Sequence, residues 1–267
     1  MSETSKTFII DKSVQGHWRV TLNNPPINVI DDGMYDAFYD LVAEIETDTA
    51  LKIVTFESAH PDFFLAHYGA SGQKSRFGVP RWIEAARRIA ESSVLSVAVI
   101  RGRVRGGGSE FVQGLDVRFA SREKAIFGQP EVATGLIPGG GALQRLPLLV
   151  GRARALEIVL GADDFSADLA ERYGWINRAL PDAELDAFVA ELARRIASFP
   201  KDGVRSTKQV LNQLTLPEAD AIRADARRFR QLVGSDAATA RTAAMFAQGL
   251  QTRGAAELDL GERIGSL

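Results

Sequence analysis

Glu110 and Glu131 stand near a glycine-rich turn that runs from Gly106 to Gly108. Two carboxyl groups that share one substrate can divide the work of general acid and general base, provided that burial and mutual repulsion push their pKa values apart. The first N–H groups of a helix that follows such a turn have no internal partner and carry partial positive charge, so they can stabilise an oxyanion. This equipment is sufficient to add water across an activated double bond.

The elements around these residues must bring both glutamates to one place. The apolar run at 97–100 predicts a buried strand, and the helix after the glycine turn is predicted to begin near Gly107. Glu110 would then lie in the first turn of that helix. A short strand is predicted at 125–127, followed by Pro130 and Glu131. A separation of 21 residues allows a strand crossing that carries both carboxyl groups toward one cleft.

The rest of the chain predicts a mixed α/β fold. Asp31 is the predicted N-cap of a helix that reaches about residue 47, and the polar stretch 69–78 is the best candidate for a mobile loop. Strands alternate with helices in the first half, which predicts a largely parallel sheet. Beyond residue 139 we expect helices and no further buried strand. Predicted strands lie at 8–10, 18–22, 53–56 and 94–100, and predicted helices at 79–92, 152–160, 166–173, 182–198 and 217–233.

Composition excludes several classes of function. The chain has 267 residues, 45% of them hydrophobic, and a formal net charge of −2, which gives no electrostatic footprint for nucleic acid. It has no cysteine and three scattered histidines, so we expect no disulfide and no metal site. Residues 1–7 lack the apolar core of a signal peptide, and no run of about 18 apolar residues could span a bilayer. We therefore expect a cytoplasmic protein that binds neither nucleic acid nor membrane.

Several motifs together resemble the crotonase superfamily, and within it the enoyl-CoA hydratases. The likeness extends over roughly residues 8–215. The motifs are Leu22-Asn23-Asn24-Pro25-Pro26-Ile27-Asn28-Val29, Gly106-Gly107-Gly108-Ser109-Glu110, Phe127-Gly128-Gln129-Pro130-Glu131 and Gly135-Leu136-Ile137-Pro138-Gly139-Gly140-Gly141. The resemblance implies a crotonase-like spiral of ββα units in residues 1–200 and a helical trimerisation region in residues 201–267. It also implies a homotrimer or a dimer of trimers that acts on an acyl-CoA thioester.

The resemblance implies roles for individual residues. Glu110 and Glu131 match the two catalytic glutamates of the hydratases, and the N–H groups of Gly107 and Tyr68 would form the oxyanion hole for the thioester. Gly139 would help to hold the water. Coenzyme A would enter as part of the substrate, with no separate cofactor and no metal. The implied substrate and CoA contacts are Asn24, Pro26, Ile27, Val29, Leu65, Ala66, His67, Gly106, Pro130 and Gly139.

The sequence departs from the family pattern in the second oxyanion segment. His67 replaces a glycine, Tyr68 an alanine and Gly69 an aspartate, and we expect His67 to form hydrogen bonds within its own loop. Three arginines precede the glycine turn, at Arg101, Arg103 and Arg105. We expect their side chains to form a solvated face, and contacts to CoA phosphates or to a carboxylated acyl group are the alternative. Double-bond isomerisation, decarboxylation, thioester hydrolysis and a catalytically weak acyl-CoA-binding protein stay open as alternatives to hydration.

Overall fold

The computed structural model describes residues 7–69 and 78–266. The predicted polar loop at 69–78 lies almost wholly outside these residues, and so do residues 1–6, in which no signal peptide is expected. The strands are β1 (Phe8–Val14), β2 (His17–Leu22), β3 (Ile53–Ser58), β4 (Phe63–Leu65), β5 (Leu95–Ile100), β6 (Arg103–Arg105), β7 (Val117–Ser121), β8 (Ile126–Gly128), β9 (Asp164–Ser166) and β10 (Arg178–Leu180).

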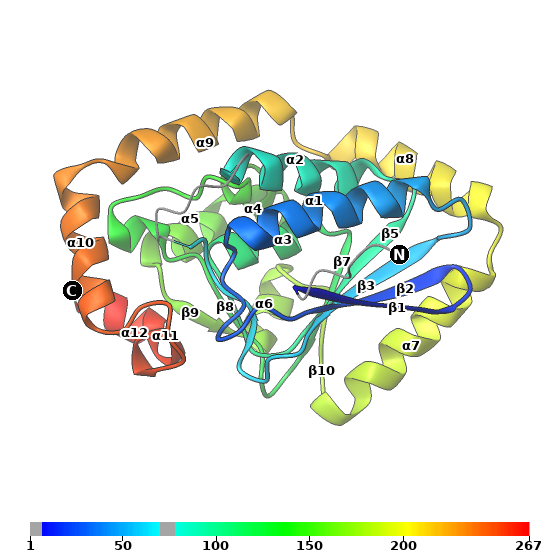
Figure 1. Ribbon diagram of the computed structural model, residues 1–267, viewed down its shortest axis with the longest axis horizontal. Helices are drawn as coiled ribbons and strands as arrows, with labels where there is room; N and C mark the ends of the chain where they lie inside the picture. The colour runs from blue at the N-terminus through cyan, green and yellow to red at the C-terminus, as the bar shows by residue number, and fades with distance from the viewer. Residues whose placement is uncertain (1–6, 70–77, 267) are drawn as a thin grey trace.

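Helices follow the strands and then dominate the second half of the chain (Figure 1). They are α1 (Asp32–Thr47), α2 (Gly78–Glu91), α3 (Gly107–Gly114), the short 3₁₀-helix η1 (Glu131–Thr134), α4 (Ala142–Val150), α5 (Arg152–Gly161), α6 (Ala167–Tyr173), α7 (Asp182–Ser198), α8 (Lys201–Thr215), α9 (Ala219–Val233), α10 (Asp236–Ala247), α11 (Ala255–Leu258) and α12 (Leu260–Ile264).

Two sheets share the strands in a repeating order. The larger sheet has the order β1-β2-β3-β5-β7-β10 and is parallel apart from the β1–β2 pair, while the smaller sheet has the order β4-β6-β8-β9. The chain places one strand in each sheet and then forms a helix, as β3, β4, α2 and again as β5, β6, α3. This repetition is the predicted spiral of ββα units.

An aromatic cluster fixes the helix that follows the glycine turn. Phe111 of α3 lies with its ring centroid 5.3 Å from Phe38 of α1, 5.5 Å from Phe56 of β3 and 5.5 Å from Trp82 of α2. All four side chains are almost fully buried. Burial of large aromatic side chains is among the strongest contributions to a core, so α3 is held firmly between α1, α2 and the sheet.

Several predicted elements are confirmed, and one expectation is wrong. The side chain of Asp31 accepts a hydrogen bond from the N–H of Met34 at 3.0 Å, as predicted for an N-cap. The expectation of no strand beyond residue 139 is wrong, because β9 and β10 complete the two sheets. Each of these strands has three residues and buries one side chain, Phe165 in β9 and Ala179 in β10. A strand of this length is too short for an alternating hydrophobic pattern to be recognised in the sequence.

The C-terminal helices fold back on their own chain. Helix α9 packs on α4, α10 packs on η1, and α12 packs on β9. Figure 1 shows α9 running along the edge of the molecule above α2 and α4, with α10 to α12 at one end near β8 and β9. These helices therefore cover the chain's own core, and the role of residues 201–267 in trimerisation stays a prediction.

Candidate active site

Glu110 lies in the first turn of α3, and its carboxylate is held from one side. Its Oε1 accepts hydrogen bonds from the N–H groups of Gly140 at 2.7 Å and Ala142 at 3.1 Å. The side chain is 1% exposed. Burial raises the pKa of Glu110 to about 7, and the two N–H groups and the guanidinium of Arg145 oppose that rise. Its Oε2 has no hydrogen-bond partner among the described residues, so one oxygen is available to a ligand.

Glu131 is the first residue of η1 and is held by an amide. The Nε2 of Gln129 donates to both carboxylate oxygens, at 2.9 and 3.1 Å. Gln129 is in turn fixed by Gln113, whose Nε2 donates to its Oε1 at 3.2 Å. Burial raises the pKa of Glu131 to about 8, and the charge of Glu110 adds to the rise. The structure thus places two carboxyl groups with raised pKa values close enough to influence each other.

The segment Leu65–Gly69 passes directly over the start of α3. A Cβ on Gly108 would overlap the carbonyl oxygens of Leu65 and Ala66, so only glycine allows this approach. Gly106 has φ 50°, a left-handed conformation that glycine adopts at little cost. The N–H groups of Tyr68 and Gly107 donate no hydrogen bond to any other described residue. Both are therefore available to an oxyanion.

The side chain of Tyr68 enters the same site. Its ring lies against Gly107, where a Cβ would come within 2.8 Å of a ring carbon. Its hydroxyl borders the Cα of Gly140 together with Oε2 of Glu110, and it has no hydrogen-bond partner among the described residues. Burial, followed by the charge of Glu110, raises its pKa well above the usual value. The phenol is thus a protonated group beside Glu110.

His67 reaches beyond its own loop. Its Nδ1 contacts the carbonyl of Tyr68 at 3.0 Å, as the sequence predicts, but its Nε2 lies 2.7 Å from Oε1 of Glu257 in α11. Sequence reasoning missed Glu257. Its spacing from His67 carries no local signal, and an acidic residue in a C-terminal helix is usually solvated.

The expectation of a solvated arginine face is wrong. Arg105 is 2% exposed and donates to both oxygens of Asp164, at 2.7 and 2.5 Å, and to the carbonyl of Glu257. Arg103 donates to the carbonyl of Leu258 at 2.7 Å, and Arg101 donates to a carboxylate oxygen of Asp182 at 2.7 Å. These groups have internal partners, so the three arginines join the β5–β6 region to distant parts of the chain.

The implied substrate and CoA contacts divide into two groups. Asn24 braces its own turn by donating to the carbonyl of Val29 at 2.8 Å, and Pro26 is exposed. Ile27, Leu65 and Ala66 have side chains in the core, so only their backbone could touch a ligand. Val29 is half-buried and packs against the cluster of Ile27, Phe63 and Ala66. The other four implied contacts border cavities: His67, Gly106 and Pro130 border the cavity of Glu131, and Gly139 borders a second one.

Two cavities meet at Tyr68 and Phe229. The smaller has a volume of about 110 Å³ and contains Glu131 and Gly107 in its wall. The larger, of about 500 Å³, lies between α2 and α9 and includes Gly139. Phe229 of α9 lines both, as does Tyr68. Residues of the C-terminal helices thus contribute to the site, which sequence reasoning did not predict.

None of the helices that the structure describes combines the length and the apolar character needed to cross a membrane. Residues 7–69 and 78–266 also contain no cluster of three or more His, Cys, Asp or Glu side chains suited to a metal ion.

Comparison with known proteins identifies relatives of this chain. The family model described as enoyl-CoA hydratase/isomerase matches residues 13–252. The short-chain-enoyl-CoA hydratase of Clostridium acetobutylicum is 32% identical over 202 residues, which cover 73% of this chain and 77% of the relative. The crotonyl-CoA hydratase of Syntrophomonas wolfei is 34% identical over 206 residues, covering 70% and 75%.

A solved structure has nearly the same fold over the full length. It is the crystal structure of a Streptomyces avermitilis protein provisionally described as an enoyl-CoA hydratase. It superposes with a TM-score of 0.92 at 44% identity and covers 100% of this chain and 99% of that one.

Proposed function

The chain belongs to the enoyl-CoA hydratase/isomerase family, and from that premise we propose that it is an enoyl-CoA hydratase. The reaction is the reversible syn addition of water to a trans-2-enoyl-CoA, which gives a 3-hydroxyacyl-CoA. The observation that carries this proposal is the pair of neighbouring carboxyl groups, buried Glu110 and half-buried Glu131, whose pKa values are raised to about 7 and about 8. A hydratase needs one of them ionised and the other protonated near neutral pH.

The two carboxyl groups take opposite roles in proton transfer. Glu110, whose carboxylate is held by two backbone N–H groups, accepts a proton from water as the water oxygen bonds to C3 of the substrate. Glu131 is the general acid and donates its proton to C2 on the same face. One water is consumed, and the proton on Glu110 passes to Glu131 before the next turnover. General acid–base catalysis of this kind contributes about 10²- to 10⁴-fold in rate.

The thioester oxygen would sit between the N–H groups of Tyr68 and Gly107. As water attacks C3, negative charge moves onto this oxygen, and two preorganised donors stabilise it. Loss of one such donor costs about 2.7–4 kcal/mol of barrier. Both N–H groups lack partners among the described residues, and the close passage of Leu65–Ala66 over Gly108 fixes their separation.

The main alternative is isomerisation, which moves a double bond from C3 to C2. One carboxyl group can shuttle that proton, so a second glutamate in the site, held by the side-chain amide of Gln129, favours hydration. An acyl-CoA-binding protein with weak activity is the alternative outside catalysis, because His67 and Tyr68 alter the oxyanion segment.

The test follows loss of the conjugated-thioester absorbance with crotonyl-CoA and longer trans-2-enoyl-CoAs. Glu110→Gln and Glu131→Gln are measured beside the wild type, and each is expected to lower kcat at least 100-fold. Turnover that survives either change would exclude the two-glutamate hydratase. Binding of CoA esters without turnover by the wild type would support the binding protein instead.

The proposed assembly is a homotrimer or a dimer of trimers in the cytoplasm. A groove of about 880 Å³ between the end of α7, α8 and α4 supports an interface, since four large apolar side chains that line it are exposed. They are Leu148, Phe199, Leu211 and Leu214. Light scattering of the wild type and of Leu211→Asp tests the assembly, and the variant is expected to dissociate.

A further inference from the structure

The larger cavity combines an apolar wall with a basic rim. Its volume of about 500 Å³ is within the range of small-molecule sites. The apolar part comes from Pro80 and Ile83 of the α2 side and from Ile222 and Phe229 of α9. Four arginines and one glutamate also line it, a formal excess of three positive charges. They are Glu84, Arg87, Arg223, Arg227 and Arg230.

Part of this charge is already neutralised within the protein. Arg87 donates to Glu84 at 2.8 and 3.3 Å, so the single glutamate of the cavity is occupied. Arg223 pairs with Asp220 at 2.5 Å. Arg227 and Arg230 form no ion pair or hydrogen bond with any residue of the described ranges. Two guanidinium groups of the rim therefore have no anionic partner in the part of the chain that the structure describes.

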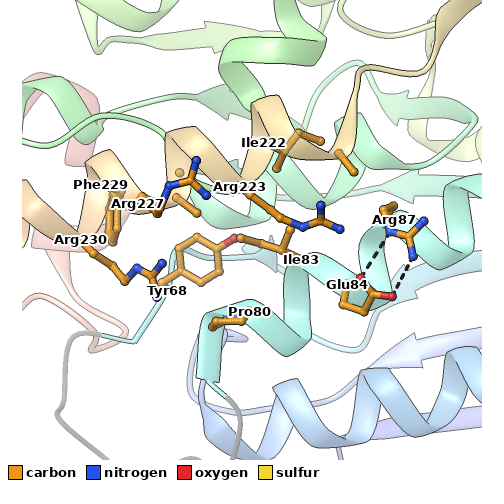
Figure 2. Close-up of a pocket in the computed structure, with 13 residues that line it drawn as sticks. Tyr68, Pro80, Ile83, Glu84, Arg87, Ile222, Arg223, Arg227, Phe229 and Arg230 are labelled. Carbon is orange, nitrogen blue, oxygen red and sulfur yellow. Dashed lines mark hydrogen bonds and ion pairs between the residues drawn. The ribbon is translucent and has the colours of Figure 1, made fainter.

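Repulsion between the arginines of this cavity destabilises α9 in the absence of a bound anion. Arg223, Arg227 and Arg230 are spaced i, i+4 and i+7, which puts three like charges on one face of α9. Figure 2 shows the guanidinium of Arg230 beside the ring of Tyr68 and that of Arg227 next to α9, with Arg87 and Glu84 on the α2 side. A bound anion would relieve this repulsion, and guanidinium groups suit a carboxylate through paired hydrogen bonds.

The cavity continues from the catalytic groups. Tyr68 lines it and also borders Glu110 and the smaller cavity of Glu131, and Gly139 adjoins Gly140, whose N–H binds Glu110. An acyl chain attached to the reacting carbons can thus extend past Tyr68 toward α9. We propose that this cavity is an acyl subsite selective for chains that end in a carboxylate, with Arg227 and Arg230 as the groups that bind it. The inference rests on the proposed function.

The experiment compares substrates that differ only in their terminal group. Kinetics are measured with trans-2-hexenedioyl-CoA against trans-2-hexenoyl-CoA, and with the eight-carbon diacid and monoacid analogues. The wild type is expected to prefer the diacid substrate. In the double variant Arg227→Gln/Arg230→Gln, the ratio of kcat/KM for diacid to monoacid is expected to fall at least about tenfold, as for loss of charged hydrogen bonds. Arg228→Gln is the matched control, because Arg228 is an exposed arginine of α9 outside the cavity.

The outcomes separate this inference from the proposed function. If the double variant loses the same factor in kcat/KM with both substrates, the arginines bind the CoA phosphates that both substrates share. That result would overturn the carboxylate subsite. An unchanged ratio, or a wild-type preference for the monoacid, would overturn it as well. If no substrate is hydrated, the affinities for adipoyl-CoA and hexanoyl-CoA are measured by calorimetry and test the subsite instead. A preference for adipoyl-CoA that is lost in the double variant would support the subsite although the hydratase proposal has failed.

Discussion

The imidazole of half-buried His67 and the carboxylate of buried Glu257 form an ion pair, with Nε2 2.7 Å from Oε1, between residues 190 positions apart. The other ring nitrogen faces the carbonyl of Tyr68 at 3.0 Å. Both nitrogens meet acceptors, an arrangement that favours the doubly protonated imidazolium. Burial lowers the pKa of His67, but the charge and hydrogen bond of Glu257 outweigh it and leave that pKa raised. The pair thus ties the segment Leu65–Gly69 to α11.

Glu257→Gln is expected to lower the free energy of unfolding by about 1–3 kcal/mol near pH 5.5, because it leaves a half-buried imidazole without its counter-charge. The folded pKa of His67 is raised above 6.5 and that of Glu257 is lowered below 4.5. The ion pair therefore contributes fully to the free energy of unfolding between about pH 4.5 and about pH 6.5, the ordinary pKa values of the two groups. It is lost as pH rises through the raised pKa of His67, or falls through the lowered pKa of Glu257.

Urea unfolding at about pH 5.5 and about pH 8.5 measures this difference. The variant should lose more stability at the lower pH. The exposed Glu262→Gln in α12 is the control and should be neutral at both. An equal loss at both pH values would mean that the pair contributes packing but no charge interaction.

The pH dependence of kcat/KM should be bell-shaped. Glu110 must be ionised to accept a proton, so activity falls below about pH 7, and Glu131 must be protonated, so activity falls above about pH 8. The two limbs belong to the pair of carboxyl groups, because each group influences the other. Initial rates of hydration across pH 5.5–9.5 measure the profile. A flat profile between about pH 5.5 and 9 would contradict the assignment.

Glu131→Gln should stabilise the fold while it abolishes activity. A carboxyl group whose folded pKa lies above the unfolded value of 4.5 costs stability once the pH exceeds 4.5, and the cost grows until the folded pKa of about 8. Glutamine has no such cost. We expect the variant to gain about 1–2 kcal/mol at pH 8 and nothing at pH 4, measured by urea unfolding. A loss at pH 8 would show that hydrogen bonds from Gln129 stabilise the carboxylate more than burial penalises it.

Local signals in the sequence explain which features could be predicted. The glycine turn, the start of α3 and the Asp31 cap depend on neighbouring residues, so their patterns are visible in the sequence. The partners of Arg105 and His67, which are Asp164 and Glu257, lie 59 and 190 residues away, and no periodicity encodes them. The wall that α9 adds to the site through Phe229 depends in the same way on how the C-terminal helices fold back.

Tyr68→Phe separates the phenol from the backbone N–H of the same residue. The N–H is retained, so oxyanion stabilisation should persist and kcat at the optimum should fall less than about tenfold. The phenol lowers the pKa of Glu110, so its loss should move the acidic limb of the pH profile to higher pH. Hydration rates across pH measure both effects. A fall in kcat as large as that of Glu110→Gln would instead make the phenol a catalytic group.

Lys208→Met should destabilise the fold without changing the chemistry. The ammonium of Lys208 in α8 is buried and donates to Oδ2 of Asp116 at 2.7 Å and to the carbonyl of Val94 at 2.6 Å. Burial lowers its pKa, and Asp116 opposes that. Methionine leaves the carboxylate of Asp116 without its cation, although Ser96 still donates to it from its N–H at 2.7 Å.

We expect a loss of about 3–5 kcal/mol in the free energy of unfolding, as for other broken buried pairs. The loss should be largest near neutral pH, where both groups are charged. Lys201→Met is the control, since Lys201 lies in the same helix and its ammonium donates to the carbonyl of Thr49 near the surface. The kcat of folded Lys208→Met, measured well below its Tm, should match the wild type because Lys208 lines neither cavity of the site. A Tm equal to that of Lys201→Met would show that α8 is held by apolar packing alone.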